Sequence, residues 1–99
     1  MRLFIASLAL ASAALAGAAN AQADRLSDSE FVALARCAGL YEGAGLDAET
    51  LNNQLRAERR GRADHIRERA TNARSEAASE ARSGADAERL AAERAACTA

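Results

Sequence analysis

The chain has 99 residues, enough for one small domain, and its 13 basic side chains are all Arg, against 14 acidic residues. A net charge of −1 and only three aromatic residues argue against the basic, aromatic-rich surface of a nucleic-acid-binding protein. Ala and Arg are frequent, Pro is absent and β-branched residues are scarce, so the composition favours helices over sheets.

Residues 1–23 have the composition of a secretory signal peptide. Arg2 supplies a positive charge, residues 3–15 form an apolar run, and small residues stand at Ala21 and Ala23. We predict cleavage after Ala23, with Ala21 as the second choice, because signal peptidase accepts small residues just before the cut. The apolar run is shorter than the ~20 residues that span a bilayer. We therefore expect a periplasmic or secreted mature chain without a transmembrane segment.

The mature domain, residues 24–99, begins with a strong helix start. Ser27 and Glu30 have the spacing of a capping box, in which each side chain bonds the backbone amide of the other residue. Gly43-Ala44-Gly45 predicts the end of this helix, because Gly adopts the left-handed conformation of a helix end at little cost. Its apolar face is expected to hold Phe31, Leu34, Cys37, Ala38 and Tyr41.

A second helix is predicted to start at Asp47, which is a favourable N-cap residue, with Leu51 and Leu55 as its apolar edge. Beyond Arg56, large aliphatic side chains are rare, and small ones take their place at helical spacing. This stripe consists of Ala63, Ile66, Ala70, Ala73, Ala77 and Ala81.

Two arrangements fit the region after Arg56. One is a single long helix over residues 56–96. The other is broken at Gly61 and at Ser83-Gly84, with Asp86 capping a last helix.

Two cysteines in an exported chain are most simply explained by a disulfide, here between Cys37 and Cys97. The closed loop of 60 residues corresponds to about 4 kcal/mol in the chain-entropy description. Bridged Cα atoms lie within about 7 Å, whereas a plain hairpin with one long second helix would carry Cys97 far past Cys37. We therefore predict an all-α fold, a small antiparallel helical bundle with four short helices favoured and three possible. A disulfide-linked dimer is the alternative to a monomer.

Charge is distributed unevenly along the mature chain. Residues 24–55 hold two Arg and six acids, whereas residues 56–69 hold six Arg and three acids. The basic segment can pack beside the acidic half, or it can attract an anionic component of the cell envelope. Within it, Glu58 and Arg62 form a favourable i,i+4 pair.

No residue pattern indicates catalysis or a cofactor. His65 is the single histidine, and Asp64 and Glu68 lie close enough on a helix to share a metal ion with it. Three arginines on the same turns repel a cation. We expect no enzyme and no cofactor, and we keep a weak metal or ligand site around His65 as a third hypothesis.

The leading hypothesis is a binding module that acts on an unknown protein or another component of the cell envelope. Its contact surface is expected among apolar residues of the first two helices: Phe31, Leu34, Tyr41, Leu51 and Leu55. The alternative is a periplasmic holdase whose thin core opens under stress. In size, export, helices and paired cysteines, the chain is similar in outline to periplasmic acid-stress chaperones and to small periplasmic immunity or inhibitor proteins, without a shared motif.

Overall fold

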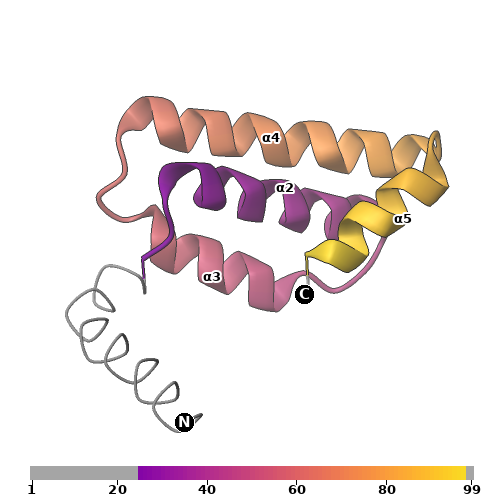
Figure 1. The fold of residues 1–99 in the computed structure, drawn as a ribbon, viewed down its shortest axis with the longest axis horizontal. Helices are drawn as coiled ribbons and strands as arrows, with labels where there is room; N and C mark the ends of the chain where they lie inside the picture. Colours follow the sequence, from indigo (N-terminus) through magenta and orange to yellow (C-terminus); the bar gives the residue numbers. More distant parts are fainter. Residues whose placement is uncertain (1–24, 98–99) are drawn as a thin grey trace, which may run out of the picture.

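The computed structural model describes residues 25–97, and every regular element within that range is an α-helix. Figure 1 shows α2 (Asp28–Gly43), α3 (Glu49–Arg59), α4 (Asp64–Ser83) and α5 (Ala87–Ala96). The all-α class and the favoured number of four helices are confirmed for this range. The predicted signal peptide and its cleavage positions lie outside the described residues. Among the described helices, none combines the length and the apolar character that crossing a membrane requires.

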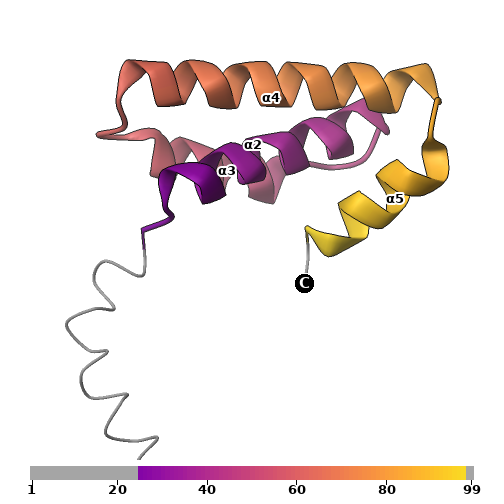
Figure 2. The ribbon, with the colours of Figure 1, turned by 45° about the horizontal axis from the view of Figure 1, so that its top comes forward.

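Helix α2 is the centre of the fold, because the other three helices pack mainly against it and little against one another. Successive helices alternate in direction, so that α3 runs antiparallel to α2 and α4 runs parallel to it (Figures 1 and 2). The prediction that successive helices run antiparallel is therefore correct. Its largest interface, however, joins the parallel helices α2 and α4, and α4 is a long helix of 20 residues.

The start and end of α2 agree with the sequence prediction. The Glu30 amide donates to the Ser27 hydroxyl at 3.1 Å, and the Ser27 amide donates to the Glu30 carboxylate at 2.9 Å. The helix ends at Gly43, and Gly45 then adopts a left-handed conformation with φ of 76°. Here two local signals were enough to place both helix ends.

The helix boundaries after α2 lie near the predicted positions, but the predicted N-cap residues act only in part as expected. Asp47 accepts a bond from the Glu49 amide at 2.9 Å, although it lies one residue before the N-cap, Ala48. The chain breaks after Arg59, around Gly61, and again at Gly84. Asp86 is the N-cap of α5, but it is left-handed and its side chain makes no capping bond.

The core differs from the predicted apolar face of α2. Phe31 and Ala38 are buried as expected, but Leu34 and Tyr41 are only half-buried, and Leu40 is completely buried. A single stripe was the wrong description, because α2 packs against helices on several sides. One buried cluster consists of Phe31, Ala35, Ala38, Leu55, Ile66 and Ala70, and a second of Leu40, Ala77 and Leu90.

Small residues hold α2 and α4 close together. Gly39 and Gly43 lie directly against the backbone of α4, at Arg74 and Ala78. The predicted stripe on α4 is buried at Ile66, Ala70 and Ala77 and half-buried at Ala73 and Ala81. It was wrong at Ala63, which is exposed and precedes the helix, and it missed the buried Ala78.

The disulfide is confirmed within one chain. Cys37 in α2 and Cys97, directly after α5, are bonded, and their Cα atoms lie 6.0 Å apart. The two breaks after Arg56 make this possible, because α5 turns back from the end of α4 towards α2 (Figure 2). The last helix is therefore tied covalently to the central one.

Candidate functional site

A cavity of about 280 Å³ lies between α2, α3 and α4, and we call it the interhelical pocket. It forms because α3 and α4 both pack on α2 but make little contact with each other. Ala35 and Ala70 face this space, and their short side chains leave open what a larger residue would fill. The lining consists of Phe31, Ala35, Asn52, Leu55, Arg56, Arg59, Ala70, Thr71 and Arg74.

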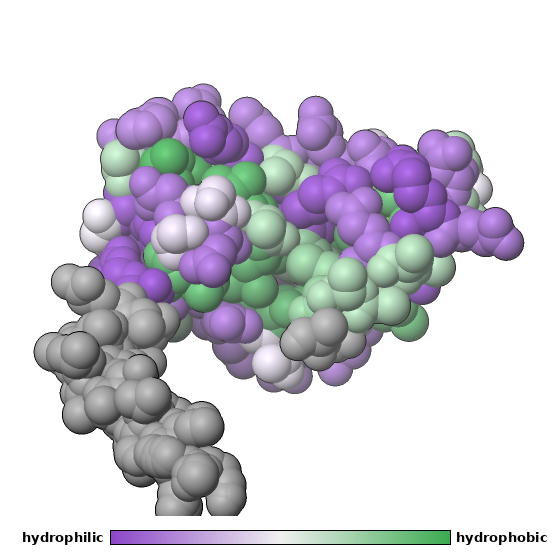
Figure 3. Space-filling view, in the orientation of Figure 1, coloured by the Kyte–Doolittle hydropathy of each residue, from purple (hydrophilic) through white to green (hydrophobic). Residues whose placement is uncertain are grey.

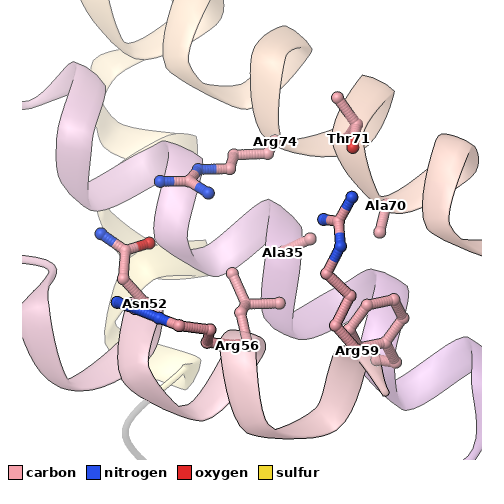
Figure 4. A pocket seen from close by; sticks show the side chains of 9 residues that line it. Ala35, Asn52, Arg56, Arg59, Ala70, Thr71 and Arg74 are labelled. Atoms are coloured by element: carbon pink, nitrogen blue, oxygen red, sulfur yellow. The ribbon is translucent and has the colours of Figure 1, made fainter. Parts of the chain in front are cut away.

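The pocket has an apolar floor and a cationic rim. Phe31, Ala35, Leu55 and Ala70 are all buried members of one core cluster. The rim carries the polar side chains, with three guanidinium groups among them. In Figure 4, Arg59 reaches from α3 towards Ala70 and Thr71 of α4, across the mouth of the pocket. This combination suits a ligand group that is apolar at one end and anionic at the other.

The three rim arginines differ in the hydrogen bonds and ion pairs that their side chains make. Arg74 donates two hydrogen bonds to Glu42, at 2.9 and 2.5 Å, so its charge is already matched. Arg56 donates to the neutral Asn53 at 3.1 Å. Arg59 has neither an ion pair nor a side-chain hydrogen bond within residues 25–97. Among the three rim arginines, Arg59 is therefore the one whose side chain has no partner in this range, and it can bind an anionic group.

Asn52 presents an unmatched acceptor beside the same pocket. Its Nδ2 donates to Glu42 at 3.2 Å, and because a carboxylate only accepts, this bond determines which way the amide faces. Its Oδ1 is buried and has no hydrogen-bond partner. In Figure 4, this oxygen is turned towards the hollow. A buried acceptor without a donor costs about 1–3 kcal/mol, which a ligand N–H group would relieve.

Arg56, Arg59 and Arg60 form an exposed cluster at the end of α3, which we call the α3 arginine surface. An open hollow next to the pocket is lined by Arg56, Arg59, Arg60, Gly61 and Arg67. Within the described part of the chain, none of the three surface arginines pairs with an acid. Positive charge on this surface is therefore left for an external partner.

Acids pair with several other arginines, and two of these arginines join helices. Arg36 pairs with Glu80 at 2.9 Å and with Glu93 at 2.5 Å, which joins α2, α4 and α5. The hydrogen bond from Arg36 lowers the pKa of Glu93, and the Arg74 hydrogen bond lowers the pKa of Glu42. In return, these bonds raise the pKa of Arg36 and of Arg74. These pairs hold helices together, so they belong to the fold and not to the exposed cationic surface.

Arg62 is an arginine of a different kind, because its side chain is only 4% exposed. It donates to Asp28 at 2.9 Å and to the Glu58 carboxylate at 2.7 Å, which confirms the predicted Glu58–Arg62 pair. Its guanidinium also lies over the Phe31 ring, 4.7 Å from the centroid. Arg62 thus fixes the turn after α3 against the start of α2, next to the floor of the pocket.

The predicted contact residues separate into two groups. Phe31 and Leu55 are buried, and they reach the surface only as the floor of the interhelical pocket. Leu34, Tyr41 and Leu51 are half-buried. Figure 3 shows an apolar band across the middle of one face, bordered by hydrophilic side chains. The sequence identified apolar residues correctly, but it gave no means of telling which of them line a pocket.

His65 is exposed at the start of α4. Across residues 25–97, no group of three or more His, Cys, Asp and Glu side chains is placed to hold a metal ion. The carboxylate of the neighbouring Asp64 is paired with Arg67. The hypothesis of a metal site around His65 therefore has no supporting geometry in this range.

Comparison of the chain with protein-family models, with curated proteins and with solved structures gave no match. The site has to be interpreted from its own chemistry. Asn52, Thr71 and Arg74 are pocket residues that sequence reasoning did not select, because their distance from one another along the chain hides the fact that they share a cavity. Arg56 and Arg59 fell within the basic segment, and only this charge signal pointed to them.

Proposed function

We propose that the mature chain is a non-enzymatic binding module of the cell envelope that holds an anionic macromolecule on the α3 arginine surface. The observation that carries the proposal is the cluster of Arg56, Arg59 and Arg60, exposed and without an acidic partner in the described range. The chain has enough carboxylates to neutralise these arginines, since acids outnumber Arg overall. Three arginines without an acidic partner in the described range therefore lie together, in a chain whose net charge is slightly negative.

A local cationic surface of this kind attracts an anionic partner mainly at short range. Screening reduces the interaction beyond about 8–10 Å at physiological ionic strength. Affinity is therefore expected to depend on close contact with the α3 arginine surface and to fall as salt rises. The apolar pocket beside the surface supplies a desolvated anchor point, which cationic residues alone do not provide.

The test is retention of partners from an envelope extract on immobilised, oxidised mature protein, at low and at high salt. The variant Arg56→Gln/Arg59→Gln removes two charges from the α3 arginine surface. The matched control, Arg69→Gln/Arg82→Gln, removes two charges from exposed positions on α4. We expect the first variant to lose a salt-sensitive partner that the control keeps. Identical retention by the two variants would overturn the proposal.

A holdase is the second candidate, and the light attachment of α5 favours it. Leu90 is the one buried residue of α5, and it covers Leu40 and Ala77. Releasing α5 would expose this apolar cluster to an unfolded client. The reduced protein should then suppress aggregation of a chemically denatured model client better than the oxidised protein does. No suppression in either redox state would remove this candidate.

A further inference from the structure

The size of the interhelical pocket limits what it can hold. Its volume of about 280 Å³ lies just below the range of about 300–1,000 Å³ that is usual for pockets of drug-sized ligands. The floor of Phe31, Ala35, Leu55 and Ala70 offers no polar side chain. Such a space has room for one apolar amino-acid residue and offers little room for a nucleotide or a large cofactor.

The rim adds a requirement for negative charge next to that side chain. Arg59 extends across the mouth of the pocket and has no ion pair in the described range, while Arg56 stands one turn earlier on α3 (Figure 4). A guanidinium group binds a carboxylate through two parallel N–H···O bonds. A carboxylate close to the apolar group would therefore gain a strong, directional partner at Arg59.

Asn52 adds a requirement for a donor. Its Oδ1 lacks a partner, and Glu42 prevents the amide from turning its Nδ2 into the pocket instead. An N–H group of a ligand would satisfy this acceptor. Because Oδ1 has almost no exposed surface in the unliganded protein, a neighbouring side chain has to move before the bond can form.

The last residue of a polypeptide carries an apolar side chain, a carboxylate and a backbone N–H on one Cα atom. An internal acidic residue does not match, because its charge lies at the end of its own side chain. We propose that the interhelical pocket binds the carboxyl-terminal residue of a partner protein, with its apolar side chain on the pocket floor. This inference rests on the proposed function in taking the occupant to be a partner protein, and it names the chemical group that is recognised.

The experiment measures binding of fluorescein-labelled Gly-Ala-Gly-Ala-Leu with a free terminal carboxylate. Three comparison peptides are the same sequence as a terminal amide, a version ending in Ser, and an amidated peptide with Leu between two Asp residues. We expect the free acid to bind at least about tenfold more tightly than each comparison peptide. Equal affinity for the acid and the amide, or for the Asp-flanked peptide, would overturn the proposal.

Variants locate the binding. Arg59→Gln should reduce the preference for acid over amide to nearly one, while Arg69→Gln, an exposed change on α4, leaves it unchanged. Asn52→Ala should weaken binding of the free-acid peptide severalfold. The ratio of the affinities for the acid and the amide peptide should not change, since the amide peptide keeps the same N–H. An undiminished preference in Arg59→Gln would contradict the assignment. Circular dichroism and melting temperature confirm that each variant is folded.

The outcome is separable from that of the proposed function. If no peptide binds, yet Arg56→Gln/Arg59→Gln loses an envelope partner, then recognition of a chain end is wrong and the arginine surface still binds. If the free acid binds selectively, yet envelope partners are retained by both double variants, then the proposed function is wrong and the pocket assignment stands.

Discussion

A Cβ atom added to Gly39 of α2 would overlap the carbonyl oxygen of Arg74 in α4. At Gly43, one turn later, an added Cβ would lie 2.7 Å from the Cβ of Ala81, well inside van der Waals contact. The two helices therefore touch through their backbones, which places Cα–H groups near carbonyl oxygens and excludes larger side chains. This contact sets the spacing of α2 and α4, and so the width of the space in which the pocket forms.

Gly39→Ala should destabilise the protein, although the same change in a free helix stabilises it by about 1 kcal/mol. The added methyl group forces α2 and α4 apart, and overpacking of this kind costs about 1–3 kcal/mol. For a domain of this size, each kcal/mol lowers the melting temperature by roughly 4–8 °C. Gly39→Val should cost more than Gly39→Ala. The control, Ala33→Val on the exposed face of α2, should cost less than about 1 kcal/mol. Equal losses of stability in Gly39→Val and Ala33→Val would contradict the close contact between α2 and α4.

Removing the disulfide should lower the free energy of unfolding by up to about 4 kcal/mol, because the closed loop spans 60 residues. The variant Cys37→Ser/Cys97→Ser and the reduced native protein should melt at similar temperatures, both below the oxidised protein. Reductant should leave the double variant unchanged. Two unlinked thiols in the oxidised protein by mass spectrometry, with a melting temperature indifferent to reductant, would show that the link is not made.

Arg62→Met should destabilise the fold by about 3 kcal/mol. Removing one partner of a buried ion pair costs about 3–5 kcal/mol, and we expect the lower value because Asp28 is exposed to solvent. The change leaves the half-buried Glu58 carboxylate and the Leu26 carbonyl without their donor. Chemical denaturation measures the loss. Arg89→Met serves as the comparison, since its pairs with Asp86 and Glu93 are longer and more exposed, and it should cost under about 1 kcal/mol. Similar losses at both positions would refute the special role of Arg62.

Stability should decline in acid because two carboxylates are held in their charged form. Glu42 and Glu93 have a pKa below the ordinary value of 4.5 in the folded protein. Below about pH 5, the unfolded chain therefore binds more protons than the folded one. The stabilisation that the charged Glu42 and Glu93 provide above this pH is lost as the pH falls through their pKa values in the folded protein. Denaturation midpoints between pH 3 and pH 7 test this.

The variants Glu42→Gln and Glu93→Gln should each flatten the acid decline, since the charge that is lost in acid is already absent. Glu88→Gln is the matched control, being exposed and without an ion pair in the described range. It should keep the slope of the native protein. A native protein equally stable at pH 3 and pH 7 would contradict the role of the Arg36 and Arg74 pairs.

Local chemistry accounts for how much of the fold was predictable. The capping box at Ser27 and the glycines at Gly45, Gly61 and Gly84 act within a few residues of the chain, so the sequence predicted where helices begin and end. The pairing of Cys37 with Cys97 was predicted from there being only two cysteines in a chain expected to be exported, and the structure confirms the pairing. The prediction that the Asp86 side chain caps α5 was wrong, because Asp86 is left-handed and its side chain makes no capping bond. That backbone conformation depends on the whole turn between α4 and α5.

The sequence by itself determined the helical class and the two ends of α2, and it indicated the later breaks and the pairing of the cysteines, since each depends on neighbouring residues or on composition. The structure decided that the region after Arg56 is broken and that the disulfide lies within one chain. Only the tertiary structure decided that α2 packs in parallel with α4, that Leu40 and Arg62 are buried, and that Ala35 and Ala70 leave a pocket. The reason is physical: burial and cavities depend on which helices meet and how closely. A periodic pattern on one helix carries no information on the number or direction of its neighbours.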